Sequence, residues 1–208
     1  MVHEGVHEKY RPMGHRPEVT QVLKRYGISG SYLLYVGRFH AGKNLIRLLQ
    51  AFATVKKQAA LKLVLVGREL FDASPIYREV LRLGLEQDVV FSGYAAEEDL
   101  PYIYSGATAF VYPSLFEGFG LPPLEAMACG TPVISSSAAS LAEIVGDAGL
   151  LFDPYNLEEL TECLFRILTD ESLRGDLRQR GLDRVRQFSW ENAAANTLKV
   201  YKEILSNS

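Results

Sequence analysis

The chain has 208 residues, of which 48% are hydrophobic, 11% aromatic and 23% charged. These are ordinary values for a globular protein, so they exclude a disordered, collagen-like or low-complexity chain, and the length allows one domain to bury its own core. Twenty-two basic against 25 acidic residues give a net charge of −3 without long runs of either sign. The charge therefore indicates neither nucleic acid nor an anionic membrane as a partner.

The first 16 residues form a polar segment with no apolar periodicity and no apolar signal region behind a basic start. His3, His7 and His15 lie in this segment, but no other residues close a set of metal ligands. We interpret it as a solvated arm or linker rather than a metal site.

Five short apolar runs predict buried strands, at residues 31–36, 61–66, 89–91, 108–112 and 132–135. They are continuous rather than alternating, as expected when helices cover both faces of a parallel sheet. All are far shorter than the roughly 20 residues of a membrane span. Amphipathic patterns between them predict helices at residues 44–58, 76–83, 97–105, 121–129 and 139–145. This alternation predicts right-handed crossovers and an open α/β sheet.

The last third of the chain changes character. It has three helical patterns with no strand between them, at residues 157–169, 173–187 and 190–205. Ser189 is a suitable N-cap for the final helix. Cys129 and Cys163 form neither a disulfide framework nor a metal-binding pattern, so we expect one soluble domain in a reducing compartment.

Ligands of open parallel sheets bind outside the carboxyl ends of the strands. The loop after the first predicted strand, Gly37 to Asn44, matches the phosphate-loop pattern G-x-x-x-x-G-K. However, Asn44 stands where that pattern places the Ser or Thr that binds Mg²⁺, and no strand end supplies the usual acidic residue, which disfavours a nucleoside triphosphatase. Arg38 and Lys43 beside a helix amino terminus instead predict a diphosphate cradle, the alternative being that both are solvated.

Other fingerprints are missing from the sequence. No G-x-G-x-x-G follows the first strand, as a nicotinamide or flavin enzyme would require, and no G-x-S-x-G indicates an α/β-hydrolase. His40 is expected to be a loop residue rather than a catalytic base.

The most informative motif follows the fourth predicted strand and reads PSLFEGFGLPPLEAMACGTP over residues 113–132. Glu117 lies in its glycine-rich loop, and Glu125 lies seven residues further on, in the first turns of a helix that Pro122 or Pro123 would start. A carboxylate has two acceptor oxygens, one for each hydroxyl of a vicinal diol. Two carboxylates on one loop and helix predict binding of the ribose and the hexose of a nucleotide sugar.

These segments, with residues 35–44, 91–94 and 143–149, resemble the carboxy-terminal domain of retaining GT-B-fold glycosyltransferases of family 4. The resemblance runs from about Ser31 to Leu205. It implies a Rossmann-like open parallel sheet with helices on both faces, the C-terminal half of a GT-B fold, ending in a helical tail.

The resemblance also implies a division of the chain. Residues 1–16 would be a linker from a missing N-terminal, acceptor-binding domain, although His3, Glu4 and His7 depart from the usual linker sequence. Residues 17–188 would form the nucleotide-sugar-binding domain. Residues 189–208 would form a helix that crosses back to the missing domain, which predicts under-covered apolar side chains at Leu198, Val200, Tyr201, Ile204 and Leu205.

By the same resemblance, each site residue has a role. Arg38 and Lys43 would hold the diphosphate and Glu117 the hexose, and these three are the catalytic candidates. Glu125 would bind the ribose. The remaining donor-binding residues would be Gly37, Gly93, Tyr94, Gly118, Phe119, Gly120 and Leu121. No metal site or cofactor is implied, because the two cations neutralise the leaving group of a UDP-, GDP- or ADP-sugar.

The implied activity is hexose transfer with retention to a glycan, lipid-linked or small-molecule hydroxyl, with this chain inactive alone. The alternatives are a stand-alone nucleotide-sugar-binding or regulatory module without turnover, and one half of a GT-B nucleotide-sugar epimerase. A cytoplasmic location is expected. Peripheral membrane association through the missing half stays open, and no nucleic acid is expected as a partner.

Overall fold

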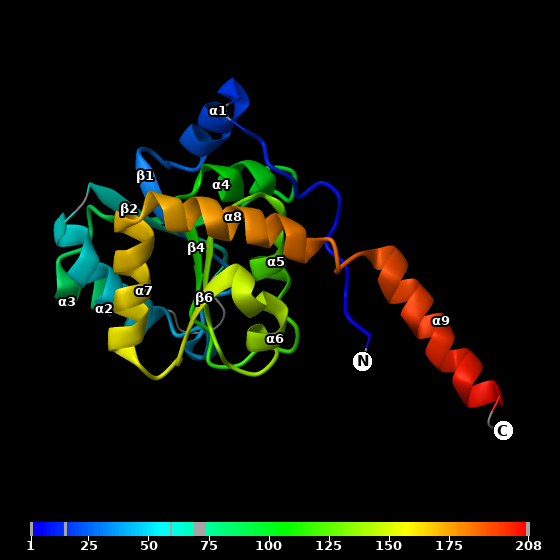
Figure 1. The fold of residues 1–208 in the computed structure, drawn as a ribbon. Helices are drawn as coiled ribbons and strands as arrows, with labels where there is room; N and C mark the ends of the chain where they lie inside the picture. Colours follow the sequence, from blue (N-terminus) through cyan, green and yellow to red (C-terminus); the bar gives the residue numbers. More distant parts are fainter. Residues whose placement is uncertain (1, 15, 59, 69–73, 207–208) are drawn as a thin grey trace.

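The computed structural model describes residues 2–14, 16–58, 60–68 and 74–206 (Figure 1). His15 of the predicted arm lies outside these residues, as do Met1 and the last two residues of the predicted tail. The described chain contains a six-stranded sheet in the order β3-β2-β1-β4-β5-β6, with every neighbouring pair parallel. The strands are β1 (Ser31–Val36), β2 (Leu61–Val66), β3 (Val89–Gly93), β4 (Ala109–Tyr112), β5 (Val133–Ser136) and β6 (Gly149–Phe152).

This order confirms the predicted Rossmann-like fold. The five predicted strands form within two residues of their expected bounds. The sixth, β6, was missed because Gly149–Phe152 is only 4 residues long, begins with glycine and closely follows a helix. Pairing with β5, from Val133 opposite Gly149 to Ser136 opposite Phe152, makes it a strand.

Helices cover both faces of the sheet. Right-handed crossovers place α2 and α3 on one face, where α2 also packs against α7, and place α4 and α5 on the other, where α1 packs against α4 and α8 against α5 (Figure 1). The helices are α1 (Pro17–Arg25), α2 (Leu45–Val55), α3 (Ser74–Leu83), α4 (Leu100–Gly106), α5 (Leu121–Ala128), α6 (Leu141–Val145), α7 (Leu157–Thr169), α8 (Glu171–Val185) and α9 (Trp190–Ser206). Short 3-10 turns occupy Ala41–Lys43, Lys56–Gln58 and Gly146–Ala148. Helix α1 was not predicted.

The amino-terminal arm is not wholly solvated, which corrects the prediction. Gly5, Tyr10 and Met13 are buried. The Val6 N–H donates to the Phe188 carbonyl at 2.9 Å, and the Met13 N–H donates to Ser105 Oγ at 3.1 Å. Because the buried residues are few and irregularly spaced, the arm shows no apolar period although it packs on the domain.

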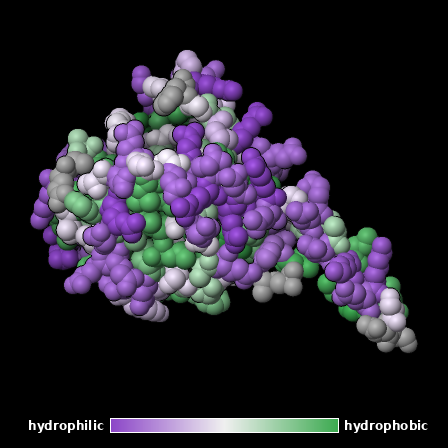
Figure 2. All heavy atoms as spheres, in the orientation of Figure 1, coloured by the Kyte–Doolittle hydropathy of each residue, from purple (hydrophilic) through white to green (hydrophobic). Residues whose placement is uncertain are grey.

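Helix α9 projects from the body of the protein (Figure 1). The Asn192 N–H donates to Ser189 Oγ at 3.1 Å, which confirms Ser189 as its N-cap. Ala193 is its buried residue, whereas the apolar residues predicted to be under-covered are exposed, namely Leu198, Val200, Tyr201, Ile204 and Leu205. Their apolar surface is visible along the helix in Figure 2. Within the described parts of the chain, no helix is both long and apolar enough to cross a membrane.

The exposed face of α9 predicts concentration-dependent self-association, because burying apolar surface between two copies releases about 25 cal/mol per Å². Sedimentation velocity should show a weakly associating species that becomes monomeric in the double variant Leu198→Ser, Leu205→Ser. The variant Lys199→Ser, on the same helix, serves as the control and should still associate. A monodisperse parent chain whose α9 amides resist hydrogen exchange would contradict the prediction.

Candidate functional site

The strand order reverses between β1 and β4, which lie side by side at the centre of the sheet. In open α/β sheets such a switch point opens a crevice outside the carboxyl ends of the strands. Both sequence motifs leave the sheet there, residues 37–44 after β1 and residues 113–120 after β4. The fold therefore brings together two segments that are about 70 residues apart in the chain.

Hydrogen bonds hold the two loops against each other. The Leu115 N–H donates to the Gly42 carbonyl at 2.9 Å. Asn44 is buried, has a left-handed φ of 57°, and donates from Nδ2 to the carbonyls of Pro113 (3.0 Å) and Pro154 (2.9 Å). The residue that departs from the phosphate-loop pattern is thus a tie between three loops, because an amide offers two N–H donors that Ser or Thr lacks.

Lys43 and Glu117 form an ion pair across the two loops. Lys43 Nζ donates to Glu117 Oε1 and lies 3.3 Å from the Tyr112 hydroxyl, and each charged side chain is only 14% exposed. Of the two cations predicted to hold a diphosphate, Lys43 is therefore enclosed, whereas Arg38 is exposed. Because the Lys43 ammonium is already removed from water and balanced by Glu117, binding an anion there requires little further desolvation of the lysine.

Ser140 fixes the loop that holds Glu117. Ser140 Oγ donates to the carbonyls of Glu117 (3.1 Å) and Phe119 (2.8 Å). Gly120 has a φ of 112° just before α5, a conformation that glycine adopts readily. Helix α5 begins at Leu121 with prolines in its first turn, as predicted. Pro122 and Pro123 have no N–H, so Leu121 carries the N–H group of this turn that lacks a helical partner.

Glu125 lies on α5, the helix that follows the loop of Glu117. The hydroxyl of Tyr112, at the end of β4, has its pKa raised by burial and by the charges of Glu117 and Glu125. Burial raises the pKa of the Glu125 carboxyl, and hydrogen bonds from Tyr104 and Tyr10 oppose that rise. The structure thus joins Lys43 and Glu117 at one edge of the sheet and places Glu125 on the helix that follows, where it is bonded to Tyr104.

A cavity of about 410 Å³ adjoins the ends of β1 and β2. Three of the predicted site residues, Gly37, Arg38 and Tyr94, line it next to Gly93 at the end of β3. Its other lining residues are Val36, Val66, Gly67, Arg68, Ala95 and Leu100. The Arg68 guanidinium lies 4.5 Å from the centroid of the exposed Tyr94 ring. Arg68 was not among the predicted site residues, although the Gly-Arg pair recurs at the ends of both β1 and β2.

Gly67 lets the ends of β1 and β2 approach each other. It has a φ of 148°, and a Cβ there would lie 1.9 Å from the Gly37 carbonyl oxygen. The Gly67 N–H donates to the Gly93 carbonyl at 2.9 Å, so backbone from three strand ends closes one side of the cavity. A side chain at this position would push the strand ends apart.

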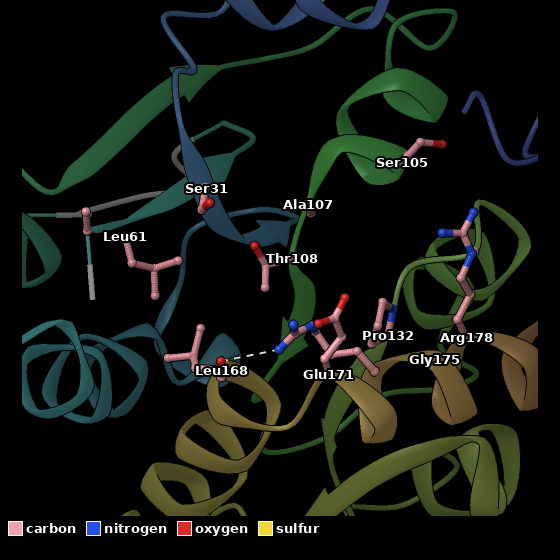
Figure 3. A pocket seen from close by; sticks show the side chains of 13 residues that line it. Ser31, Leu61, Ser105, Ala107, Thr108, Pro132, Leu168, Glu171, Gly175 and Arg178 are labelled. Atoms are coloured by element: carbon pink, nitrogen blue, oxygen red, sulfur yellow. Dashed lines mark hydrogen bonds between the residues drawn. The ribbon is translucent and has the colours of Figure 1, made fainter. Parts of the chain in front are cut away.

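A larger cavity of about 540 Å³ opens at the opposite edge of the sheet, where Ser31, Leu61, Thr108 and Pro132 mark the amino ends of four strands (Figure 3). Arg174, on α8, donates there to the Ile167 and Leu168 carbonyls at 2.7 and 3.2 Å. Its guanidinium therefore caps the last turn of α7. None of the predicted site residues lines this cavity. We therefore place the functional site at the carboxyl edge, where the two motifs meet.

Within residues 2–14, 16–58, 60–68 and 74–206, no three His, Cys, Asp or Glu side chains are grouped so that they could hold a metal ion. His3 instead contacts Glu143 at 2.9 Å, which anchors the arm to α6.

Comparison with known proteins identifies the family of the chain. Residues 27–184 match the family described as "Glycosyl transferases group 1". The chain belongs to this family. It is 40% identical to the O-antigen chain mannosyltransferase B of Escherichia coli over 89% of its own length and 49% of that protein. It is 32% identical to the mannosylfructose-phosphate synthase of Agrobacterium fabrum, over 85% of the chain and 41% of that protein. The chain thus spans half or less of these two relatives.

Solved structures of this glycosyltransferase group share the fold. The sucrose-phosphate synthase of Thermosynechococcus elongatus superposes with a TM-score of 0.83 at 30% identity, over 99% of the chain and 52% of that structure. The C-terminal domain of a group 1 glycosyl transferase of Francisella tularensis superposes with a TM-score of 0.77 at 27% identity, over 88% of the chain and 97% of that structure. The fold is therefore GT-B-like, and the chain is a glycosyltransferase domain.

The position of Asn44 in this domain predicts a large loss of stability on replacement. Asn44→Ala would leave the buried Pro113 carbonyl unpaired and the Pro154 carbonyl with Arg47 as its remaining donor, so we expect the free energy of unfolding to fall by about 1–3 kcal/mol. Asn44→Thr, which restores the phosphate-loop pattern, should be destabilised as well. Urea denaturation measures both, with the exposed Asn192→Ala as the control. Stability equal to the control would show that Asn44 is not a structural tie.

Proposed function

We propose that this chain is the donor-binding domain of a retaining glycosyltransferase, which moves a hexose from a nucleotide diphosphate sugar to an acceptor hydroxyl of a glycan, a lipid-linked sugar or a small molecule. The observation that carries the proposal is the Lys43–Glu117 ion pair at the switch point of the sheet. It sets a cation for a leaving phosphate directly beside a carboxylate for sugar hydroxyls, at the edge where such folds bind ligands.

The hexose of the donor would lie on the Glu117 side of this pair, and the nucleotide would lie on the Lys43 side. Arg38 and Lys43 bind the diphosphate, together with Gly37 and the N–H groups of Gly118, Phe119, Gly120 and Leu121 at the start of α5. Glu117 binds the hexose. Glu125 binds the ribose, and the base enters the cavity beside Gly93, Tyr94 and Arg68. The ring of Tyr94 and the apolar walls of that cavity suit a flat heterocycle, because its faces stack on aromatic and apolar surface.

The chemistry would be largely electrostatic. As the bond between the anomeric carbon and the diphosphate oxygen breaks, negative charge grows on that oxygen and is stabilised by Lys43 and Arg38. The acceptor oxygen forms its new bond on the same face of the sugar, which retains the anomeric configuration, and its proton passes to the departing phosphate. This scheme needs neither a protein nucleophile nor a metal ion.

Two features of the comparisons support finer proposals. Relatives carry mannosyltransferase in their names, so we propose mannose as the hexose. The chain aligns with nearly all of a structure that is itself a C-terminal domain, so we propose that this chain is a C-terminal half. An acceptor-binding domain would then precede the arm and cover α9, and any peripheral membrane contact would belong to that domain. The chain without that domain would be inactive. We propose a cytoplasmic location for the enzyme.

The proposal predicts binding without turnover. Calorimetric titration of the chain with UDP, GDP and ADP should show that at least one binds, and that its mannose or glucose conjugate binds too, while no sugar is released to water or transferred. Absence of binding by all three would contradict the donor site. Tight binding with steady conversion of one nucleotide sugar into another would instead favour the epimerase alternative.

The Lys43–Glu117 pair predicts opposite effects for its two halves. Lys43→Met should weaken binding of the nucleoside diphosphate by about tenfold or more, since a hydrogen bond between charged groups is lost. Glu117→Gln should bind the free diphosphate at least as well as the parent, because Lys43 is released, yet lose the affinity that the sugar adds. Titration of both ligands separates these effects, with Lys199→Met on α9 as the control. If Glu117→Gln keeps the sugar's contribution, Glu117 does not bind the hexose.

A further inference from the structure

Two tyrosines that come from distant parts of the chain lie at the Glu125 carboxylate. Tyr104, on α4, donates to Glu125 Oε2 at 2.9 Å. Tyr10, in the amino-terminal arm, packs against Tyr104 close enough to this carboxylate for its charge to raise the pKa of the Tyr10 hydroxyl. The rings of Tyr10 and Tyr104 meet edge to face, with centroids 6.0 Å apart.

Both phenols are enclosed by the protein. Tyr104 is fully buried and Tyr10 is 8% exposed. Burial and the charge of Glu125 raise the pKa of both phenols, so they remain protonated donors at any ordinary pH. A buried phenol hydroxyl requires an acceptor, and the Glu125 carboxylate is the acceptor for Tyr104.

The arm is held in place around Tyr10. Lys9 lies over the Tyr10 ring at 5.3 Å and pairs with Glu97 at 2.7 Å. On the other side of Tyr10 in the sequence, the Met13 N–H donates a hydrogen bond to Ser105 Oγ on α4. Contacts with two parts of the domain thus fix the backbone on both sides of Tyr10, which keeps its hydroxyl at Glu125.

A glutamate side chain has three rotatable bonds, so a carboxylate that must grip a diol gains from being held in advance. Ionised carboxylates accept about four hydrogen bonds, and the bond from Tyr104 uses only part of this capacity. Acceptor positions therefore remain on the carboxylate, while the hydrogen bond from Tyr104 restrains its rotation.

We infer that Tyr10 and Tyr104 are positioning residues that hold the Glu125 carboxylate for the ribose hydroxyls of the donor, which makes the amino-terminal arm part of the donor site. The inference rests on the proposed function for the role of Glu125. It adds two residues, one of them in a segment that sequence analysis interpreted as a solvated linker.

The test compares two ligands in matched variants. The parent chain, Tyr10→Phe, Tyr104→Phe and Tyr32→Phe are titrated with whichever of UDP, GDP and ADP binds the parent best, and with its 2′,3′-dideoxy form. Tyr32→Phe is the control, because it removes an equally buried hydroxyl that donates to the Ile103 carbonyl at 2.6 Å on the same helix, without touching Glu125. Thermal unfolding verifies that each variant folds.

The expected result is a smaller preference for the ribose over the dideoxyribose, by about fivefold in each of Tyr10→Phe and Tyr104→Phe, with no change in Tyr32→Phe. A purely structural role would weaken both ligands equally and leave the preference intact, and this result would overturn the inference. If no diphosphate binds the parent chain, the proposed function fails and the ribose role fails with it.

A second measurement needs no ligand. Removing a hydrogen bond to the ionised form of a carboxyl raises its pKa. Carbon-13 NMR titration of the Glu125 carboxyl, assigned with Glu125→Gln, should therefore give a higher pKa in Tyr10→Phe and in Tyr104→Phe than in the parent, with Lys9, Glu97 and Cys129 unchanged as the other titratable neighbours. A pKa that neither replacement moves would overturn the positioning role even if nucleotides bind normally.

Discussion

The pairing of β1 with β4 at the centre of the sheet is the constraint on which the site depends. Parallel strands end at the same edge, so adjacency of these two strands brings the loop after β1 against the loop after β4. Asn44 and the backbone of Leu115 then lock the loops at fixed separation. Only in this arrangement can Lys43 reach Glu117, and the crevice between the loops follows from the order of the strands rather than from either motif alone.

Charge in the crevice is balanced before any ligand arrives. A lone ammonium or carboxylate enclosed to the extent of Lys43 and Glu117 would be strongly disfavoured, so each stabilises the other in the folded chain. A diphosphate and a sugar would replace that internal pair by two new contacts, one for each partner. The exposed Arg38 and Arg68 add positive charge at the adjoining cavity, where a diphosphate can be met from water.

Two terminal segments behave differently although both contain scattered apolar residues. The arm buries Tyr10 and Met13 against α4, and the Val6 N–H donates a hydrogen bond to the Phe188 carbonyl. The arm therefore belongs to the folded domain. Helix α9 begins beside the arm, where Gly5 packs against the backbone of Ser189 and Trp190, and then leaves the body with its apolar side chains exposed. The arm therefore contributes to the site, whereas α9 offers an apolar surface.

Much of this protein was determined by sequence alone. Continuous apolar runs and amphipathic periods predicted five strands and most helices, because burial of both faces requires a continuous apolar run in the sequence. The glycine-rich motifs predicted the edge of the sheet at which the candidate site lies. Tertiary structure alone decided the rest. The strand β6 exists through pairing with β5, Asn44 became a tie through two loops remote in sequence, and Tyr10 joined Glu125 through folding of the arm. These contacts join residues far apart in the chain, so no local pattern of residue types encodes them.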